Sequence, residues 1–289
     1  MKLSLAPRGP FDFYQGLKDI TRAPFGLTEQ LENNQYLTVL FDRLVTIQQE
    51  KKDGNLIVEF NDGNPSINQK IAEEITRRFG LLQDLEAFYG FAGGNRKLIP
   101  IIHKLRGLTM FQKSSPFEAL VTAIADQQLN VSFATTLKRR LILTYGRKFK
   151  SHGLELWTFP TCNTLAKLED GALRPLQYSN SKSRFIIHLA KGIVAGNYPL
   201  EEWSLLDDRD LIQSLMSIYG VGQWTAEYVA MVGYNRCDVI PAADIGLQRA
   251  VQLCYELSDR PGENEVRAIA KRWSPWRGLV TYYLWHAFE

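Results

Sequence analysis

Cysteine is scarce in this chain of 289 residues, and its three copies lie far apart, at Cys162, Cys237 and Cys254. None of them forms a C-x-x-C pair, so their spacing indicates neither a zinc site nor a disulfide framework. Three cysteines are also too few for a four-cysteine iron–sulfur loop. We therefore expect a protein of a reducing compartment.

Long apolar runs and a strong net charge are also missing. No stretch of eighteen apolar residues occurs, and the apolar start of the chain is broken at Pro7 and Arg8, too early for a signal peptide. The protein is therefore expected inside the cell, in the cytoplasm or the nucleus. The formal charge of +3 cannot establish a nucleic-acid partner, because affinity for phosphates depends on where the cations lie. The four histidines show no spacing typical of metal ligands or of a catalytic triad.

The first part of the chain is rich in β-forming residues. Segments 37–47 and 55–60 are separated by Lys52-Asp53-Gly54, which predicts a β-hairpin. A helical pattern follows over 65–79. Together they indicate a small mixed α/β unit over residues 1–91, with the glycine-rich segment 90–94 as its linker to the rest.

Nearly everything from Ile99 onward has helical periodicity, with short connections that carry Pro, Gly, Asn or Ser. This pattern predicts a compact all-α region of eight to ten helices, and the chain as a whole is expected in the α+β class. The expected helices cover 117–127, 132–145, 163–168, 182–195, 208–218, 225–232, 245–257, 263–272 and 277–288.

Two glycines, Gly220 and Gly222, lie between the amphipathic segments 208–218 and 224–232. Glycine lets the backbone turn tightly and approach a ligand closely, and a helix start offers free amide N–H groups to an anion. This hairpin between two helices is typical of a site that grips a phosphate.

A nearly isolated carboxylate, Asp244, stands twenty residues after Trp224, at the start of the next helical pattern. Taken alone, such an aspartate is more often a helix N-cap than a catalytic group. The two roles are compatible, because the positive end of a helix stabilises an ionised carboxylate.

These residues resemble the helix-hairpin-helix DNA glycosylase superfamily, in its alkylated-base branch of the 3-methyladenine DNA glycosylase II type. The likeness extends over about 105–288 and rests on the Gly-Val-Gly hairpin followed by Trp224-Thr-Ala, on the step to Asp244, and on segments 115–128 and 272–285. It implies a helical glycosylase region, 92–289, behind an N-terminal appendage. This region would form one subdomain from 112–242, which contains the hairpin, and another from 92–111 with 243–289, with the active cleft between them.

The resemblance implies that Asp244 is the catalytic aspartate of an N-glycosyl hydrolase. Members that also cut the DNA backbone carry a lysine two residues after the second hairpin glycine, and this chain has Trp224 there. Without an amine nucleophile, the enzyme is expected to be monofunctional and to leave an intact abasic site. The implied role is the excision of alkylated purines, such as 3-methyladenine and 7-methylguanine, in base excision repair.

Three aromatic residues, Trp224, Tyr228 and Trp285, match positions that line the base pocket in this branch. Packing into the core is the commoner fate of an aromatic residue at helical spacing, so Tyr228 fits either role equally well. Rings that stack on a flipped base would favour an electron-poor, cationic purine through cation–π attraction.

The remaining implied residues contact the DNA. Gln127 and Gln128 end a helical pattern and could simply be exposed; by resemblance they face the DNA, with Gln128 at the position of the wedge that fills the gap left by the flipped nucleotide. Relatives have an apolar wedge there. Gly220, Gly222 and Thr225 would bind a phosphate.

No cofactor is required by this chemistry, although the resemblance suggests a structural Na⁺ or K⁺ at the hairpin. It would be held by the backbone carbonyls of Met216, Ile218 and Val221. The partner is expected to be double-stranded DNA that contains damaged bases, bound by a monomer; in a bacterial cell the protein would then lie on the nucleoid.

Two other functions are compatible with parts of this pattern. One is a helix-hairpin-helix protein that binds DNA without chemistry, but such a protein has no reason to place Asp244 beside an aromatic set. The other is a glycosylase for oxidised or deaminated bases, against which the missing lysine and iron–sulfur cysteines argue.

Overall fold

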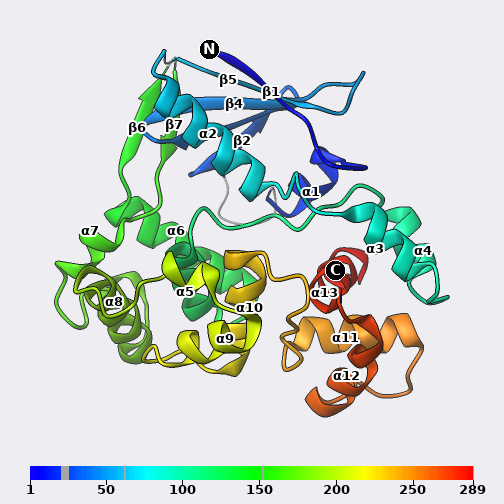
Figure 1. Ribbon diagram of the computed structural model, residues 1–289. Coiled ribbons are helices and arrows are strands. Elements are labelled where there is room, and N and C mark those ends of the chain that lie inside the picture. Colours follow the sequence, from blue (N-terminus) through cyan, green and yellow to red (C-terminus); the bar gives the residue numbers. More distant parts are fainter. Residues whose placement is uncertain (21–25, 62, 152, 289) are drawn as a thin grey trace.

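The computed structural model describes residues 1–20, 26–61, 63–151 and 153–288. A small antiparallel sheet lies at one end of the molecule, and two groups of helices lie beneath it side by side (Figure 1). The α+β class predicted from the sequence is confirmed. In the described part of the chain, no helix combines the length and the apolar character that a membrane span needs.

The N-terminal sheet has the strand order β1-β5-β4-β3-β2, with every neighbouring pair antiparallel. Its core contains an aromatic cluster in which Phe79 packs edge-on against Phe13, Tyr36 and Phe111 at centroid distances of 4.9–5.5 Å. The elements of this unit are β1 (Lys2–Leu5), α1 (Phe13–Ile20), β2 (Glu29–Glu32), β3 (Gln35–Leu40), β4 (Arg43–Gln49), β5 (Leu56–Phe60) and α2 (Pro65–Arg78).

The predicted hairpin around residues 52–54 is confirmed as β4–β5, but the expected single strand over 37–47 is wrong. That segment folds back at Phe41-Asp42, where both residues have positive φ values, 46° and 63°. A two-residue turn with two positive φ angles matches the twist of adjoining strands. Such a turn usually contains glycine or asparagine, and this one contains neither of them.

The expected linker at 90–94 is also wrong. Residues 90–92 form the last turn of α3 (Leu85–Ala92), and Phe88 on this helix packs against Tyr283 with ring centroids 5.0 Å apart. The hydrophobic core of the sheet ends at Leu81, apart from Phe111, and the helical core begins at Leu85. The change from one core to the other therefore comes before α3.

The helical region follows the predicted pattern closely, since its apolar residues repeat at the helical period. One hydrophobic cluster runs through both groups of helices. Its helices are α4 (Ile99–Lys104), α5 (Pro116–Asp126), α6 (Val131–Tyr145), α7 (Cys162–Ala166), α8 (Asn180–Val194), α9 (Asp208–Met216), α10 (Gln223–Tyr234), α11 (Ile245–Tyr255), α12 (Glu263–Ala270) and α13 (Arg277–Phe288).

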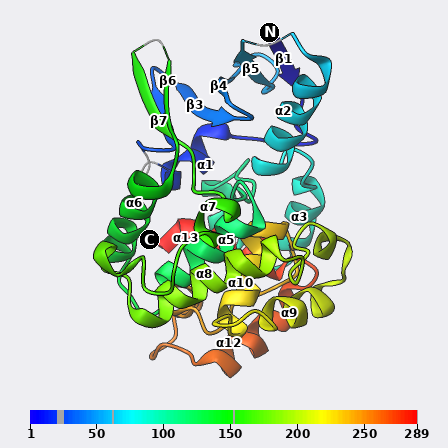
Figure 2. The ribbon, with the colours of Figure 1, turned by 90° about the vertical axis from the view of Figure 1, so that its left-hand side faces the viewer.

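One feature departs from the expected all-α region. Strands β6 (Lys148–Ser151) and β7 (Leu154–Trp157) form a hairpin that rises from the helices beside the N-terminal sheet (Figure 2). The amide of Trp157 donates to the carbonyl of Leu27 at 2.7 Å. This hairpin therefore ties the sheet unit to the helical region.

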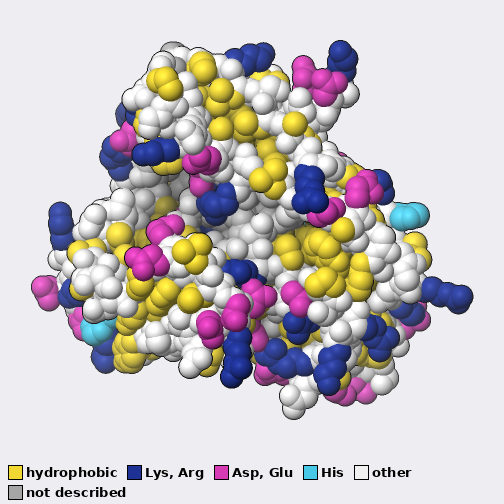
Figure 3. All heavy atoms as spheres, viewed as in Figure 1, with side chains coloured by type: hydrophobic (Ala, Val, Ile, Leu, Met, Phe, Trp, Pro, Cys, Tyr) yellow, Lys and Arg dark blue, Asp and Glu magenta, His cyan; other side chains and the backbone are white. Residues whose placement is uncertain are grey.

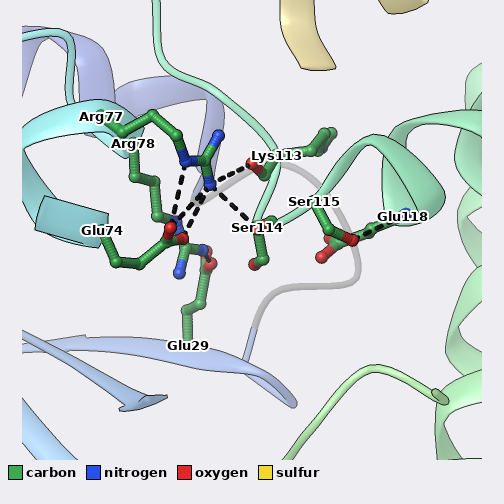
Figure 4. A network of polar contacts seen from close by, with 8 residues as sticks. All are labelled: Glu29, Glu74, Arg77, Arg78, Lys113, Ser114, Ser115 and Glu118. Atoms are coloured by element: carbon green, nitrogen blue, oxygen red, sulfur yellow. Dashed lines mark hydrogen bonds and ion pairs between the residues drawn. The ribbon is translucent and has the colours of Figure 1, made fainter. Parts of the chain in front are cut away.

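A second tie joins α2 to the start of α5 (Figure 4). The guanidinium of Arg77 binds Glu74 and donates to the carbonyls of Lys113 and Ser114 at 3.0 and 2.9 Å. Beside it, Arg78 forms a buried ion pair with Glu29. The sheet unit is thus held against the segment that leads into the hairpin-bearing group of helices.

Candidate active site

The glycine hairpin connects α9 to α10, and its two glycines are needed for different reasons. Gly220 has φ +90°, and a Cβ atom there would lie 2.3 Å from the ring of Phe185. Gly222 is the N-cap of α10 and is exposed, with no atom within 4 Å of the place a Cβ would take. Gly220 thus shapes the turn, while Gly222 leaves the start of α10 open to a ligand.

Asp244 is the N-cap of α11, so the structural role expected for it is present. Its Oδ1 oxygen accepts the backbone N–H of Leu247 at 2.8 Å and the indole N–H of Trp285 at 3.1 Å. Its Oδ2 oxygen accepts the indole N–H of Trp224 at 3.1 Å. One half-buried carboxylate is therefore held by three elements, α10, α11 and α13.

These contacts fix the direction of the carboxylate but do not saturate it. An ionised carboxylate only accepts hydrogen bonds and offers about four lone-pair sites, and three N–H groups occupy three of them here. In its ionised form, this carboxylate can therefore present a fixed negative charge and a free lone pair to a molecule beside it.

The three aromatic residues predicted for the base pocket lie together beside Asp244. Trp224 and Tyr228 stack along α10 with centroids 5.6 Å apart and an interplanar angle of 18°, and Tyr228 lies 6.1 Å from Trp285 on α13. All three are only half-buried. The three rings therefore form one aromatic wall beside Asp244. The two tryptophans of this wall also donate the hydrogen bonds that orient the carboxylate.

The two glutamines at the end of α5 point to different places. Gln127 turns inward, and its amide donates to the carbonyl of Gly220 at 3.1 Å and to the hydroxyl of Thr225 at 3.0 Å. Gln128 is exposed and has φ +54°. Gln128 is therefore accessible at the surface, while Gln127 ties its turn to the hairpin.

Thr225, which is predicted to bind a phosphate, has its side chain turned away from the surface. This residue is only 2% exposed, and its hydroxyl is engaged by Gln127. Its place in the first turn of α10 still leaves the backbone as a possible contact.

The three carbonyls expected to hold a cation lie at the end of α9 and in the hairpin. The carbonyl of Ile218 accepts the N–H of Val221 at 3.0 Å. A carbonyl oxygen has a second lone pair, so this turn is compatible with a monovalent cation on Met216, Ile218 and Val221.

Sequence reasoning missed a pocket of about 540 Å³ on another face of α10, toward α9 and α12. The nearly buried Glu227 forms an ion pair there with Arg267 at 2.8 Å, and Asp238 pairs with Arg277 at 2.8 Å. Burial raises the pKa of Glu227, against hydrogen bonds from Gln223 and Arg267. The lower edge between the two helix groups carries acidic and basic side chains together (Figure 3). The sequence did carry one sign of this ion pair, because Glu227 is the single charged residue within the apolar sequence of α10.

The sequence pattern of the HhH-GPD superfamily of base excision DNA repair proteins matches residues 121–275, more than half of the chain. The chain belongs to this superfamily. The matched segment contains the hairpin, two of the three aromatic residues and Asp244, and the resemblance inferred from the sequence is confirmed.

Individual proteins are similar to this chain over nearly its whole length. A DNA-3-methyladenine glycosylase of Bacillus subtilis is 29% identical over 283 residues, which cover 95% of this chain and 93% of that one. The solved structure of a 3-methyladenine DNA glycosylase from Archaeoglobus fulgidus has a TM-score of 0.85 and 24% identity, covering 99% of this chain and 97% of its own. That likeness shows a common fold, sheet unit included.

A third similar protein was solved in complex with DNA. The 3-methyladenine DNA glycosylase of Schizosaccharomyces pombe in complex with abasic DNA is 25% identical, with a TM-score of 0.59, and the match covers 69% of this chain and 95% of that chain.

Proposed function

We propose that this protein is a monofunctional DNA glycosylase that hydrolyses the N-glycosidic bond of alkylated purines, such as 3-methyladenine and 7-methylguanine. The observation that carries the proposal is the carboxylate of Asp244, held by indole N–H groups of Trp224 and Trp285 beside an aromatic wall. The names of the B. subtilis, A. fulgidus and S. pombe relatives support the substrate class.

The chemistry follows from charge. An alkylated purine is cationic and already a good leaving group, so the enzyme has mainly to stabilise positive charge that develops on the deoxyribose as the bond breaks. A fixed carboxylate beside the sugar does this without reorganising, and its free lone pair can orient the attacking water. The proton that this water loses passes to the bulk solvent or to the released base.

Recognition of the DNA divides between two parts of the site. The open start of α10 at Gly222 is suited to a backbone phosphate, which positions the duplex without reading its sequence. Gln128 would occupy the space left by the flipped nucleotide, and the rings of Trp224, Tyr228 and Trp285 would contact the extruded base. A monovalent cation on the hairpin carbonyls would add one more link to phosphate.

The partner is therefore double-stranded DNA with damaged bases, which supports a location on the nucleoid in the cytoplasm or in the nucleus. One copy of the chain supplies every group of this mechanism, so we propose that it acts as a monomer and needs no redox or catalytic metal cofactor.

A different function would be DNA binding without chemistry. The orientation of Asp244 argues against it, since a helix cap needs only the bond to Leu247 and no indole donors. Excision of oxidised bases by Schiff-base chemistry is disfavoured by Trp224 in place of a lysine.

The decisive experiment measures the free base released from methylated duplex DNA and from duplexes with hypoxanthine or 8-oxoguanine. The proposal predicts release of 3-methyladenine and 7-methylguanine, with abasic strands that remain intact until treated with alkali. Binding of the duplexes without release of any base would overturn it, and spontaneous strand cleavage would overturn the monofunctional assignment.

A further inference from the structure

The turn after α5, which carries Gln128, is held by a buried lysine from another helix. Lys182 lies in the first turn of α8 and is 9% exposed. Its ammonium donates to the carbonyl of Ala125 at 2.8 Å and to the carbonyl of Gln127 at 2.6 Å. These contacts tie the end of α5 to the first turn of α8.

The carbonyls at a helix end lack partners within the helix, and a cation there is favourable because the helix C-terminus carries partial negative charge. Here α5 ends at Asp126, and the chain then enters Gln128 in the left-handed region, which disfavours side chains other than glycine. Such a conformation persists only where its surroundings hold it. Lys182 supplies charge-assisted hydrogen bonds at this place.

The same turn is also held by the hairpin. The amide of Gln127 bonds to Gly220 and Thr225, so its carbonyl is fixed by α8 while its side chain is fixed by the hairpin. A third contact, Lys138 with Asp126 at 2.8 Å, fixes a side chain rather than the backbone. Burial lowers the pKa of Lys182, while the charge of Asp126 acts in the opposite direction.

We infer that Lys182 is a positioning residue for base flipping: it holds the turn of Gln128 at a fixed place relative to the hairpin that grips the phosphate. This inference rests on the proposed glycosylase function. Lys182 touches neither base nor sugar in this role, so its loss must affect the extrusion of a paired base rather than the breaking of the bond.

The test compares Lys182→Met with the wild type in single-turnover excision of one lesion in two duplexes. In one duplex the lesion is paired, and in the other it faces an abasic-site analogue, where no base pair has to be broken. The variant is expected to lose about tenfold or more on the paired lesion, the value of a charged hydrogen bond, and less than about threefold on the unpaired one. Equal loss on both duplexes, or no loss, would overturn the inference.

Two variants control for stability. Lys191→Met removes an exposed lysine from the same helix and should leave both rates unchanged. Lys182→Arg keeps the charge and the donors, and should restore most of the paired-lesion rate even if Lys182→Met folds poorly. A folded Lys182→Arg protein that loses both rates equally would contradict a positioning role.

A second readout separates this inference from the proposed function. In Asp244→Asn protein, 2-aminopurine next to the lesion should brighten on binding because the neighbouring base is unstacked, and adding Lys182→Met should suppress that signal. If the wild type releases no methylated base, the proposed function fails, and the fluorescence still decides the role of Lys182. Unchanged fluorescence on adding Lys182→Met would overturn the role of this lysine.

Discussion

The indole N–H of Trp224 donates to the Oδ2 oxygen of Asp244 at 3.1 Å, across twenty residues of sequence. Trp224 therefore makes two contacts: its ring stacks on Tyr228, and its N–H fixes one oxygen of the proposed catalytic carboxylate. Trp285 does the same for the other oxygen from a different helix. The same two rings therefore orient the carboxylate and make the base contact that we propose.

Replacing Trp224 by Phe separates its two contacts, since Phe keeps a ring next to Tyr228 but has no N–H donor. A hydrogen bond to a charged group contributes about 1.5–3 kcal/mol, so single-turnover excision should fall by about 10- to 100-fold while duplex affinity changes little. Trp203→Phe, in a part of the chain that does not contact Asp244, is the matched control. A normal rate with weakened binding would show that Trp224 acts only as a stacking surface.

Removing the ring of Trp285 tests base recognition. Trp285→Ala should weaken recognition of the extruded base by about 1–3 kcal/mol, the usual value for an aromatic stacking platform. The cationic 3-methyladenine should lose more than the neutral hypoxanthine, because only the cation loses a cation–π contribution. Excision rates on the two lesions measure the difference, and an unaltered preference would mean that Trp285 acts only through its hydrogen bond to Asp244.

The two hairpin glycines should respond differently to the same change. Gly222→Val adds a side chain in open space at the start of α10, so it should weaken binding to damaged and undamaged duplexes alike without lowering the melting temperature. Gly220→Val should unfold at a lower temperature, because its positive φ and the ring of Phe185 oppose any side chain. Binding titrations and thermal melts decide, and a loss confined to one lesion would place Gly222 in the base pocket instead.

The ion pair between Asp238 and Arg277, at the start of α13, should make the stability of the fold depend on pH. Burial alone would raise the pKa of Asp238, but hydrogen bonds from the Arg277 side chain and N–H and from Ser274 outweigh it and hold this pKa below its ordinary value. A carboxyl with a lowered pKa stabilises the fold above its unfolded pKa of about 4, and this contribution disappears as the pH falls through the folded value.

Asp238→Asn should therefore lower the free energy of unfolding by about 1 kcal/mol at pH 7, a small effect because solvent screens this partly exposed pair. The difference from the wild type should shrink as the pH falls below about 4. Denaturant unfolding across pH 3–7 measures it, with the exposed Asp259→Asn as control. A difference that grows in acid would contradict this assignment.

How far the sequence predicts the molecule depends on how local each signal is. Helical periodicity predicted most of the helices, and the resemblance to the helix-hairpin-helix glycosylases predicted the cluster around Asp244 that the structure assembles. The turn at Phe41-Asp42 lacks the residues that usually mark it, and the short strands β6 and β7 have too few residues to show alternation. The turn and the two strands were therefore not predicted.

The contacts of the site were harder to predict than its members. Nothing in the sequence tells that the tryptophans donate to Asp244, that Thr225 is buried or that Lys182 reaches the end of α5, since each depends on the packing of helices distant in sequence. Only Glu227, a charge inside an apolar run, carried a local sign of its ion pair with Arg267.

The most direct test of the account is single-turnover release of 3-methyladenine from duplex DNA by the wild type and by Asp244→Asn. Asparagine can keep the cap on Leu247 but removes the negative charge beside the sugar, so the rate should fall by about 10² or more while duplex affinity and melting temperature stay near those of the wild type. A rate within a few-fold of the wild type would contradict the assignment of Asp244 as the catalytic carboxylate.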